Sequence, residues 1–532
     1  MIQIMDKEKQ RITDQSLKLI ERFTLAFAGE KNIQADNEKT INTALIYEKI
    51  RVALEYQEEH LILKNAISRI LRRHHTLSIN PNSDFLYSNL ISELSWSNYL
   101  NPESLTTKTS ELIQSRIGAY LVLLRYSKSG RFSKHELQKM IIEWLSIEIE
   151  EILRPQSENE IFVNYTYEIL RKNISLENSK VSEEESEIQL KIAIYSNLLK
   201  PDFSSIQFLA LNYTYPSWKT FPNEETKKFA KSFDPYFNKV DAALNHKFKK
   251  RYTQYVRKCI APFILYRKIL SAKNINLESI KDNPKILLSM VLDRYDLDII
   301  DAKQKVWRAT IRAFAFILLT KISLAFILEI PFDRLLSGSI DYLSLLINIS
   351  LPPILMIIAG SSVKSPAAKN RLIISETFQS ITTENKISDI KFPIAPQKPN
   401  KTFQIFNLIY SIFTIFIVFG VIWLLIALHF NIVSILLFFF FVSVVSFFSF
   451  RIRNIALELA MKRIKDDAVT SVVELLFLPF IRIGKYFSDR FAAFNPFIIA
   501  LDFLIEAPLK TIIKIVTSWF RFINKKKEDL EI

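Results

Sequence analysis

Two long apolar runs in the second half of the chain constrain its fold more than any other feature. Residues Phe403 to Leu428 and Ile432 to Phe450 contain no Asp, Glu, Lys or Arg, and only His429-Phe430-Asn431 connect them. About twenty apolar residues cross the hydrocarbon layer of a bilayer as a helix. Each run therefore predicts a transmembrane helix, and the short connection predicts that the two form a tight antiparallel hairpin.

Two further segments, from about Thr310 to Ile330 and from about Ile340 to Ile358, are weaker candidates for spans. The first has Lys321 at its middle, but its Leu, Ile and Phe residues at roughly −0.3 to −0.6 kcal/mol each outweigh roughly +3 kcal/mol for a central lysine. The second contains Pro352-Pro353, a pair that removes two backbone donors and should kink or split a helix.

Basic residues near the ends of the four segments predict their orientation. Lys and Arg gather before the first segment, between the second and third, and after the fourth, whereas the other two connections hold only Arg334. Cytoplasmic loops carry such an excess of Lys and Arg. We therefore expect a multi-pass protein of the inner (plasma) membrane, with the N-terminus and the C-terminus both cytoplasmic.

The rest of the chain indicates helices. Glycine, which tight turns and phosphate-binding loops require, occurs only 7 times. Ser133-x-x-Glu136 is a capping box at the start of an apolar helical pattern. The stretch from Ile206 to Tyr236, rich in aromatic residues, is expected to be irregular, and the acidic run 181–187 is expected to break the helices.

The predicted fold class is an all-α integral membrane protein with four transmembrane helices, a large helical cytoplasmic N-terminal domain and C-terminal interfacial amphipathic helices. The expected organisation is a helical cytoplasmic domain over 1–305 (with a subdivision near 177–190), transmembrane helices one and two over 306–360, a cytoplasmic loop over 361–402, a transmembrane hairpin over 403–452, a cytoplasmic extension of the fourth helix over 453–466, interfacial helices over 467–524 and a charged tail over 525–532.

The C-terminal stretch supports the interfacial helices. In DFLIEAPLKTIIKIVTSWFRF the polar residues recur every three or four positions, so they form one narrow stripe on an otherwise apolar helix. Such a helix lies in the plane of the membrane surface. Lys525, Lys526 and Lys527 then suit contact with anionic lipid headgroups. Two helices packed around a soluble core, or a re-entrant pair, are the alternatives.

Charges inside apolar segments are the candidate functional residues, because an ionisable group within a membrane is a functional-site hypothesis by default. They are Lys321, Glu329, Glu474, Asp502 and Glu506. Glu329 lies eight residues after Lys321, which is too far for a direct i, i+4 pair, so the expected counter-charge of Lys321 is one of the last three acids. The simpler alternative is a lysine hydrogen-bonded to neighbouring carbonyl groups.

The segment HKFKKRYTQYVRK, from His246 to Lys258, interleaves basic and aromatic residues. A segment of this kind can bind anionic lipid or nucleic acid, or it can be an ordinary solvent-exposed helix face. Since the same chain carries membrane spans, we prefer lipid over nucleic acid. The candidate lipid contacts are Lys247, Lys249, Lys250 and Arg251.

Catalytic motifs are absent from the sequence. It contains no G-x-x-x-x-G-K-[ST], G-x-G-x-x-G or G-x-S-x-G. Cys259 is the single cysteine, and Glu59-His60 lacks the second histidine of H-E-x-x-H. We predict no catalytic, cofactor-binding or metal-binding residue, and no cofactor.

The stretch ALIYEKIRVALEYQEEHLILKNAISRILRRH, the hairpin spans, DDAVTSVVELLFLPFIRIGKY and LDFLIEAPLKT together resemble a family of uncharacterised multi-span membrane proteins of small-genome candidate-phylum bacteria. The resemblance implies a bacterial plasma membrane. It implies no activity and no functional residues.

The expected function is that of a membrane-anchored scaffold, whose cytoplasmic helices hold an unknown protein partner at the lipid bilayer. A homo-oligomer is compatible with the sequence. The alternative is a transporter, channel or lipid-handling protein that uses the charges embedded in its apolar segments.

Overall fold

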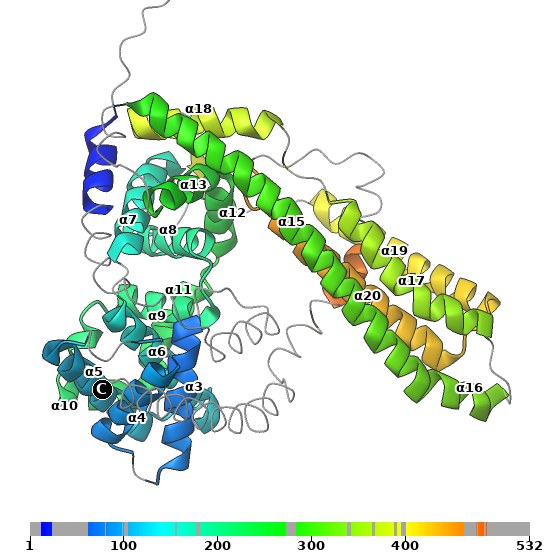
Figure 1. Ribbon diagram of the computed structural model, residues 1–532, viewed down its shortest axis with the longest axis horizontal. Coiled ribbons are helices and arrows are strands. Elements are labelled where there is room, and N and C mark those ends of the chain that lie inside the picture. Colours follow the sequence, from blue (N-terminus) through cyan, green and yellow to red (C-terminus); the bar gives the residue numbers. More distant parts are fainter. Residues whose placement is uncertain are drawn as a thin grey trace, which may run out of the picture. The chain divides into compact units, whose positions relative to one another are not determined.

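The computed structural model describes residues 12–23, residues 62–461 apart from short gaps, and parts of 475–486. These residues form an all-α fold, shown in Figure 1. The strands among them are two residues long each, β1 (Ile174–Ser175) and β2 (Phe392–Pro393), which pair in parallel. The chain divides into two compact units, one containing residues up to Leu288 and 377–396, the other containing Ser289–Glu376 and Gln397–Pro508.

The first unit is a helical domain that contains a large apolar core. Trp144 is fully buried there and stacks on Phe233 and Phe237. The helices and 3₁₀ turns that the structure describes in this unit include α3 (Ile62–Leu77), α4 (Ser83–Trp96), α5 (Thr107–Tyr126), α6 (Lys134–Leu153), α7 (Ser157–Leu170), η3 (Arg171–Asn173), α8 (Glu183–Leu198), α9 (Phe203–Thr214), η4 (Trp218–Thr220), α10 (Asn223–Lys231), α11 (Phe233–Leu244), α12 (Lys249–Cys259) and α13 (Ala261–Leu270).

The local structure that we predicted from the sequence of this unit is confirmed in part. The capping box at Ser133 and Glu136 is confirmed at the start of α6. The acidic run 181–187 was expected to break the helices, but its glutamates form the first turn of α8 behind the N-cap Ser182. Negative charge is favourable there because it faces the positive end of the helix dipole. The expected irregular stretch 206–236 is also wrong, since α9, α10 and the start of α11 occupy most of it.

Four helical runs are long and apolar enough to cross a membrane, namely Pro284–Leu335, Tyr342–Ser361, Leu408–Ala427 and Ile432–Ala456. The first comprises α15 (Pro284–Leu324), the π-helical turn η5 (Ala325–Glu329) and most of α16 (Ile330–Ser337). The others are α17 (Tyr342–Ser361), α19 (Lys401–Ala427) and α20 (Ile432–Ala456). The prediction of four apolar helices at these places is confirmed.

The turn between α19 and α20 is as tight as its sequence suggested. His429 adopts a positive φ of 60°. The side chain of Asn431 accepts a hydrogen bond from the backbone N–H of Ser434 and so caps α20. Four residues, Leu428 to Asn431, thus connect the two helices.

Three details differ from expectation. α17 continues through Pro352 and Pro353, so the pair does not split the helix. The expected loop 361–402 contains α18 (Ala368–Glu384). α20 ends at Ala456 rather than near 466, and Asn370 of α18 contacts the chain just beyond this end. Its side-chain amide donates to the carbonyl of Leu459 and accepts from the N–H of Met461, which replaces helical hydrogen bonds.

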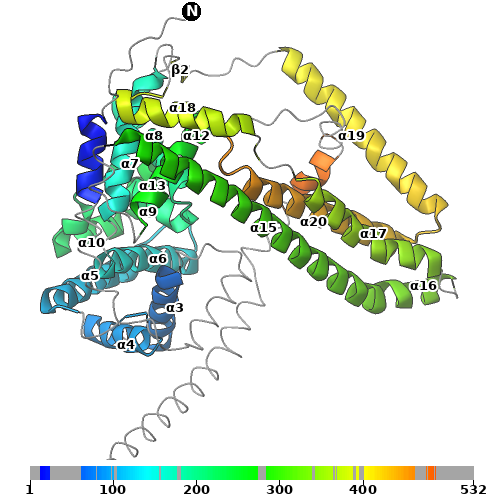
Figure 2. The ribbon, with the colours of Figure 1, turned by 45° about the horizontal axis from the view of Figure 1, so that its top comes forward.

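The helices α15, α17 and α20 lie side by side in both ribbon views (Figures 1 and 2). Their shared core includes Ile317, Met356 and Phe441. Gly360 of α17 touches α15 so closely that an added Cβ would lie 2.8 Å from Thr310 Cβ. α19 behaves differently: 6% of its most apolar stretch is buried, against 39% for α20. Figure 2 shows α19 diverging from α20 away from their connecting turn.

Candidate functional site

Lys321 forms an ion pair with Glu329 inside the second unit. The Lys321 Nζ lies 2.5 Å from Glu329 Oε1, and both side chains are fully buried. Both residues belong to the first apolar helical run. The pair therefore lies among the residues that would cross the hydrocarbon layer.

The expectation that Glu329 is out of reach of Lys321 is wrong, and the backbone explains why. Eight residues make about 2.2 turns of a regular α-helix, which would place the two side chains on different faces. The turn Ala325–Glu329 is π-helical, and such a turn takes one additional residue. The spacing of eight is then equivalent to about seven, or nearly two full turns, so the flexible lysine side chain can extend along one face to the carboxylate.

Two other helices complete the site. Asn348 of α17 donates from Nδ2 to Glu329 Oε2 at 2.9 Å and to the carbonyl of Ser434 in α20 at 3.4 Å. Phe441 of α20 has its ring centroid 5.2 Å from Lys321 Nζ, within the range of a cation–π contact. We call Lys321, Glu329 and Asn348 the buried triad. It joins α15, η5, α17 and α20 by polar contacts.

One acceptor of the triad has no partner. Asn348 is fully buried, and its Oδ1 accepts no hydrogen bond. Pro352 and Pro353 lie four residues after Asn348 and Ile349, so these prolines cannot donate to the carbonyls of those two residues. The site thus combines a neutralised charge pair with a side-chain oxygen that can still accept a hydrogen bond.

The energetic meaning of the triad follows from its surroundings. An isolated charge near the centre of a membrane helix costs about 2.5–3.5 kcal/mol on insertion scales. Pairing Lys321 with Glu329 neutralises both charges, and polar contacts hold helices together where lipid gives no hydrophobic driving force between them. These polar contacts can therefore fix α15, α17 and α20 against one another, and Asn348 Oδ1 remains without a hydrogen-bond partner.

The other predicted intramembrane charges and the predicted C-terminal lipid contacts lie outside the described residues. They are Glu474, Asp502, Glu506, Lys525, Lys526 and Lys527. Their roles stay predictions; among the described residues, the counter-charge of Lys321 is Glu329.

The basic segment around α12 has its aromatic residues turned inward. Phe248, Tyr252 and Tyr255 are buried, and the two tyrosine hydroxyls donate to Ser186 Oγ and to the carbonyl of Leu170. They are not free to stack on nucleic-acid bases, and their spacing of four and three residues is that of a helix face turned to a core. The predicted lipid contacts Lys247 and Lys250 are exposed, and Lys249 and Arg251 are half-buried.

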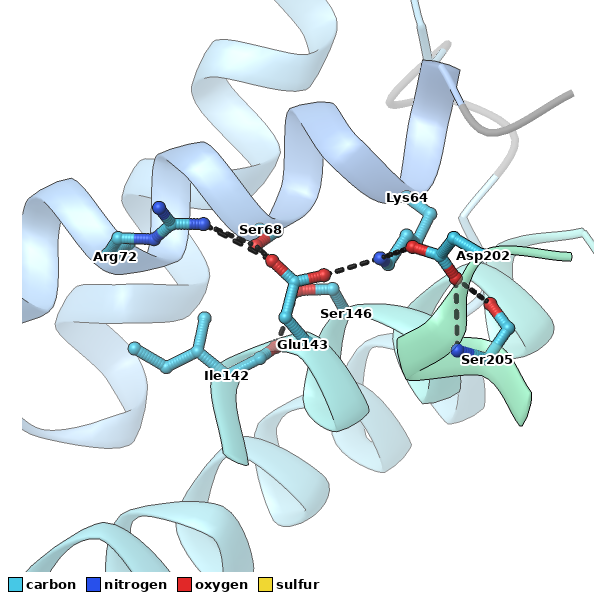
Figure 3. A network of polar contacts seen from close by, with 8 residues as sticks. All are labelled: Lys64, Ser68, Arg72, Ile142, Glu143, Ser146, Asp202 and Ser205. Atoms are coloured by element: carbon cyan, nitrogen blue, oxygen red, sulfur yellow. Dashed lines mark hydrogen bonds and ion pairs between the residues drawn. The ribbon is translucent and has the colours of Figure 1, made fainter. Parts of the chain in front are cut away.

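A second buried lysine, which we did not predict, lies in the first unit (Figure 3). Lys64 of α3 is 1% exposed and contacts Glu143 of α6 and Asp202 at the start of α9. Glu143 also accepts from Ser68 Oγ at 2.7 Å and from Arg72 at 3.2 Å, and Asp202 accepts from Ser205. A sequence signal existed, because Lys64 and Ser68 alternate with apolar residues on the buried stripe of α3.

The electrostatics of this network favour its charged form. Burial lowers the pKa of Lys64, but the carboxylates of Glu143 and Asp202 outweigh burial, and its pKa is raised. Burial likewise opposes the charge on Asp202, yet Lys64 and Ser205 hold its pKa below the usual value. Nearby Glu150 behaves in the opposite way, since burial raises its pKa to about 7.

Within the described residues, no group of three or more His, Cys, Asp or Glu side chains is placed to hold a metal ion. The buried triad is thus the site with the clearest chemistry in the described part of the chain. Comparison with known proteins adds no identity, because no family model, no curated protein and no solved structure matches this sequence.

Proposed function

We propose that the protein is a membrane-anchored scaffold, in which the four apolar helices hold the chain in a bilayer and the helical first unit binds a protein partner. The observation that carries this proposal is the pairing of Lys321 with Glu329. A charge neutralised by its own chain stabilises an anchor and leaves no net charge to attract an ion.

The first unit offers a surface for such a partner at the corner between α3 and α4. Leu77, Ile79 and Phe85 expose 73%, 104% and 43% of their surface there. Because these three residues are close in the sequence, we propose that their exposed side chains form one apolar patch, of the kind that marks protein interaction sites. We call these three residues the α3–α4 corner.

The test is cross-linking of the full-length chain in cells, followed by purification and identification of the attached proteins. In the variant Leu77→Asp/Ile79→Asp we expect one wild-type partner to be lost. Phe203→Asp is the matched control, because Phe203 is also exposed and apolar, at 64%, but lies on α9. Identical sets of attached proteins in the wild type and both variants would contradict the proposal.

The second candidate is transport of a small cation, and the observation that favours it is the unpartnered Asn348 Oδ1 beside the ion pair. The test is flux of protons, Na⁺ and K⁺ in vesicles reconstituted with wild-type protein or with Lys321→Leu. Transport through this site requires a flux that the substitution changes. Equal flux, with both proteins inserted, would exclude a role of Lys321 in it.

A further inference from the structure

The exposed side of α15 changes from basic to apolar along a single stripe. Lys305, Arg308 and Arg312 are exposed, and Phe316 and Leu319 expose 51% and 67% of their surface. Successive members are three or four residues apart, so they lie on one face of the helix. We call these five residues the α15 stripe. Its two ends match a ligand that carries a negative charge at one end and hydrocarbon at the other.

The charged residues of the first apolar helical run indicate the depth of the α15 stripe in a bilayer. Asp333 is 21 residues after Arg312, which is about 31 Å along a helix. The hydrocarbon layer is about 30 Å thick. The charged residues between these two, Lys321 and Glu329, neutralise each other. Arg312 is thus expected at one edge of the layer, with the apolar end of the stripe inside it. Trp307, which is 52% exposed, lies just outside that edge, where tryptophan is enriched in membrane proteins.

The two arginines of the stripe have neutral partners. Arg308 Nη2 donates to Gln304 Oε1 at 2.8 Å, and Arg312 Nε donates to the carbonyl of Arg308 at 3.3 Å. The sequence explains why, because residues 302–328 contain no Asp or Glu. The ion pairs that the structure describes in the second unit join other residues. Both guanidinium groups can therefore bind an anion that is not part of the chain.

Arg294 has the contrasting arrangement on the same helix. It forms an ion pair with Asp298, four residues further on, at 2.9 Å. Arg294 is 22 residues before Phe316, which is about 33 Å along the helix and more than the thickness of the hydrocarbon layer. It is thus a matched control, a partly exposed arginine of α15 that already has a carboxylate partner and lies far from the apolar end of the stripe.

We propose that an anionic phospholipid binds along the α15 stripe, with its phosphate between Arg308 and Arg312 and an acyl chain over Phe316 and Leu319. Guanidinium groups bind phosphate by paired, charge-assisted hydrogen bonds. Residues four positions apart are separated by about 6 Å along a helix, so both arginines can contact one phosphate. The proposal goes beyond the scaffold role. It rests only on the four apolar helices lying in a bilayer, and it needs no protein partner.

The first test measures which lipid contacts the apolar end of the stripe. Leu319→Trp adds a fluorescent reporter to the full-length protein, and the protein without this substitution gives the background. The protein is reconstituted in vesicles that contain phosphatidylglycerol or phosphatidylcholine with identical brominated acyl chains, which quench a tryptophan that they contact. We expect the anionic lipid to quench the reporter at a lower fraction of the bilayer than the zwitterionic lipid.

This preference should depend on the two arginines. A basic residue near the membrane surface strengthens the binding of anionic lipid about fivefold. Arg308→Gln/Arg312→Gln should therefore lower the preference by about that factor for each arginine removed, whereas Arg294→Gln should leave it unchanged. The proposal is overturned by an undiminished preference in the double variant. It is also overturned by equal quenching by both lipids when the arginines are present, which is the result expected if they bind an acidic protein segment instead.

A second measurement needs no reporter and applies should Leu319→Trp fail to accumulate. Native mass spectrometry of the purified full-length protein in detergent identifies the phospholipids that remain bound. The wild type and Arg294→Gln should retain an anionic phospholipid that Arg308→Gln/Arg312→Gln has lost. The same bound lipids in all three proteins would contradict the proposed site.

Discussion

Each unit buries one lysine among its described residues, and the two lysines have different partners. Lys64 in the first unit has two carboxylates, and these accept further hydrogen bonds from Ser68, Arg72 and Ser205. Lys321 in the second unit has one carboxylate, and the amide that completes its site keeps an unpartnered oxygen. The Lys64 site thus contains more carboxylates than are needed to neutralise the lysine, whereas the Lys321 site contains a single ion pair.

The difference follows from what drives the helices together. In water, apolar burial supplies most of the stability, so the Lys64 network adds orientation to a core that would form without it. Between apolar helices in lipid that driving force is absent, and packing and polar contacts remain. We therefore expect that a charge left unpaired in the buried triad weakens helix association in the second unit, whereas the Lys64 network orients helices that apolar burial already holds together.

The largest effect is expected from Lys64→Ala, which leaves the carboxylates of Glu143 and Asp202 without their cation. Removing one partner of a buried ion pair costs about 3 kcal/mol. Hydrogen exchange of the α3 and α6 amides in the full-length protein measures the loss. Lys227→Ala is the control, because its i, i+3 pair with Glu224 is exposed, and exposed ion pairs contribute little to stability. Equal losses of stability in the two variants would contradict the expectation that the buried pair costs more to break than the exposed one.

A slightly smaller loss, about 2.5 kcal/mol, is expected from Glu329→Leu, because Lys321 then remains buried and charged. The double variant Lys321→Met/Glu329→Leu should recover most of it, since apolar residues can replace a buried pair. Thermal stability in detergent, followed by size-exclusion chromatography, compares the three proteins. If the double variant is as unstable as the single one, the pair itself, rather than the unpaired charge, holds the helices.

The substitution Glu150→Gln tests whether every buried carboxylate of the first unit stabilises its folded state. Its pKa is raised to about 7 by burial, from an ordinary 4.5. The folded state therefore prefers the protonated acid, so Glu150 lowers stability progressively as the pH rises from 4.5 to 7. Glu150→Gln should stabilise the unit by about 2 kcal/mol at pH 8 and not at all below pH 4.5. The exposed Glu111→Gln is the control in the same unfolding measurement, and a gain independent of pH would contradict the assignment.

Features that depend on composition and on short-range patterns could be predicted from the sequence. The four apolar helices, the turn at His429 to Asn431 and the capping box at Ser133 each follow from residues that are neighbours in the chain. Lys321 and Glu329 were also recognised as charges in an apolar segment. Their pairing was missed because a π-helical turn changes the face on which Glu329 lies, and no motif announces such a turn.

The sequence pattern could not predict which residues far apart in the chain contact each other. Lys64 occupies the apolar stripe of α3, which marks it as buried, but Glu143 and Asp202 are 79 and 138 residues away. Asn348 is likewise a single polar residue in an apolar run until α17 packs against η5. Neither pairing involves residues that are close in sequence, so only the packing of the helices defines them.

The smallest effects should come from removing one neutral hydrogen-bond donor at each site. Ser68→Ala removes a bond to Glu143 and should cost about 1 kcal/mol. Asn348→Leu removes two hydrogen bonds, each worth about 0.6 kcal/mol in a membrane. It also removes a buried oxygen without a partner, whose burial costs about 1–3 kcal/mol. Asn348→Leu should therefore be neutral or stabilising in the detergent assay while Ser68→Ala destabilises. A clear loss for Asn348→Leu would mean that a hydrogen-bond donor occupies Oδ1 in the membrane, and the second unit would then hold a ligand rather than a minimal anchor.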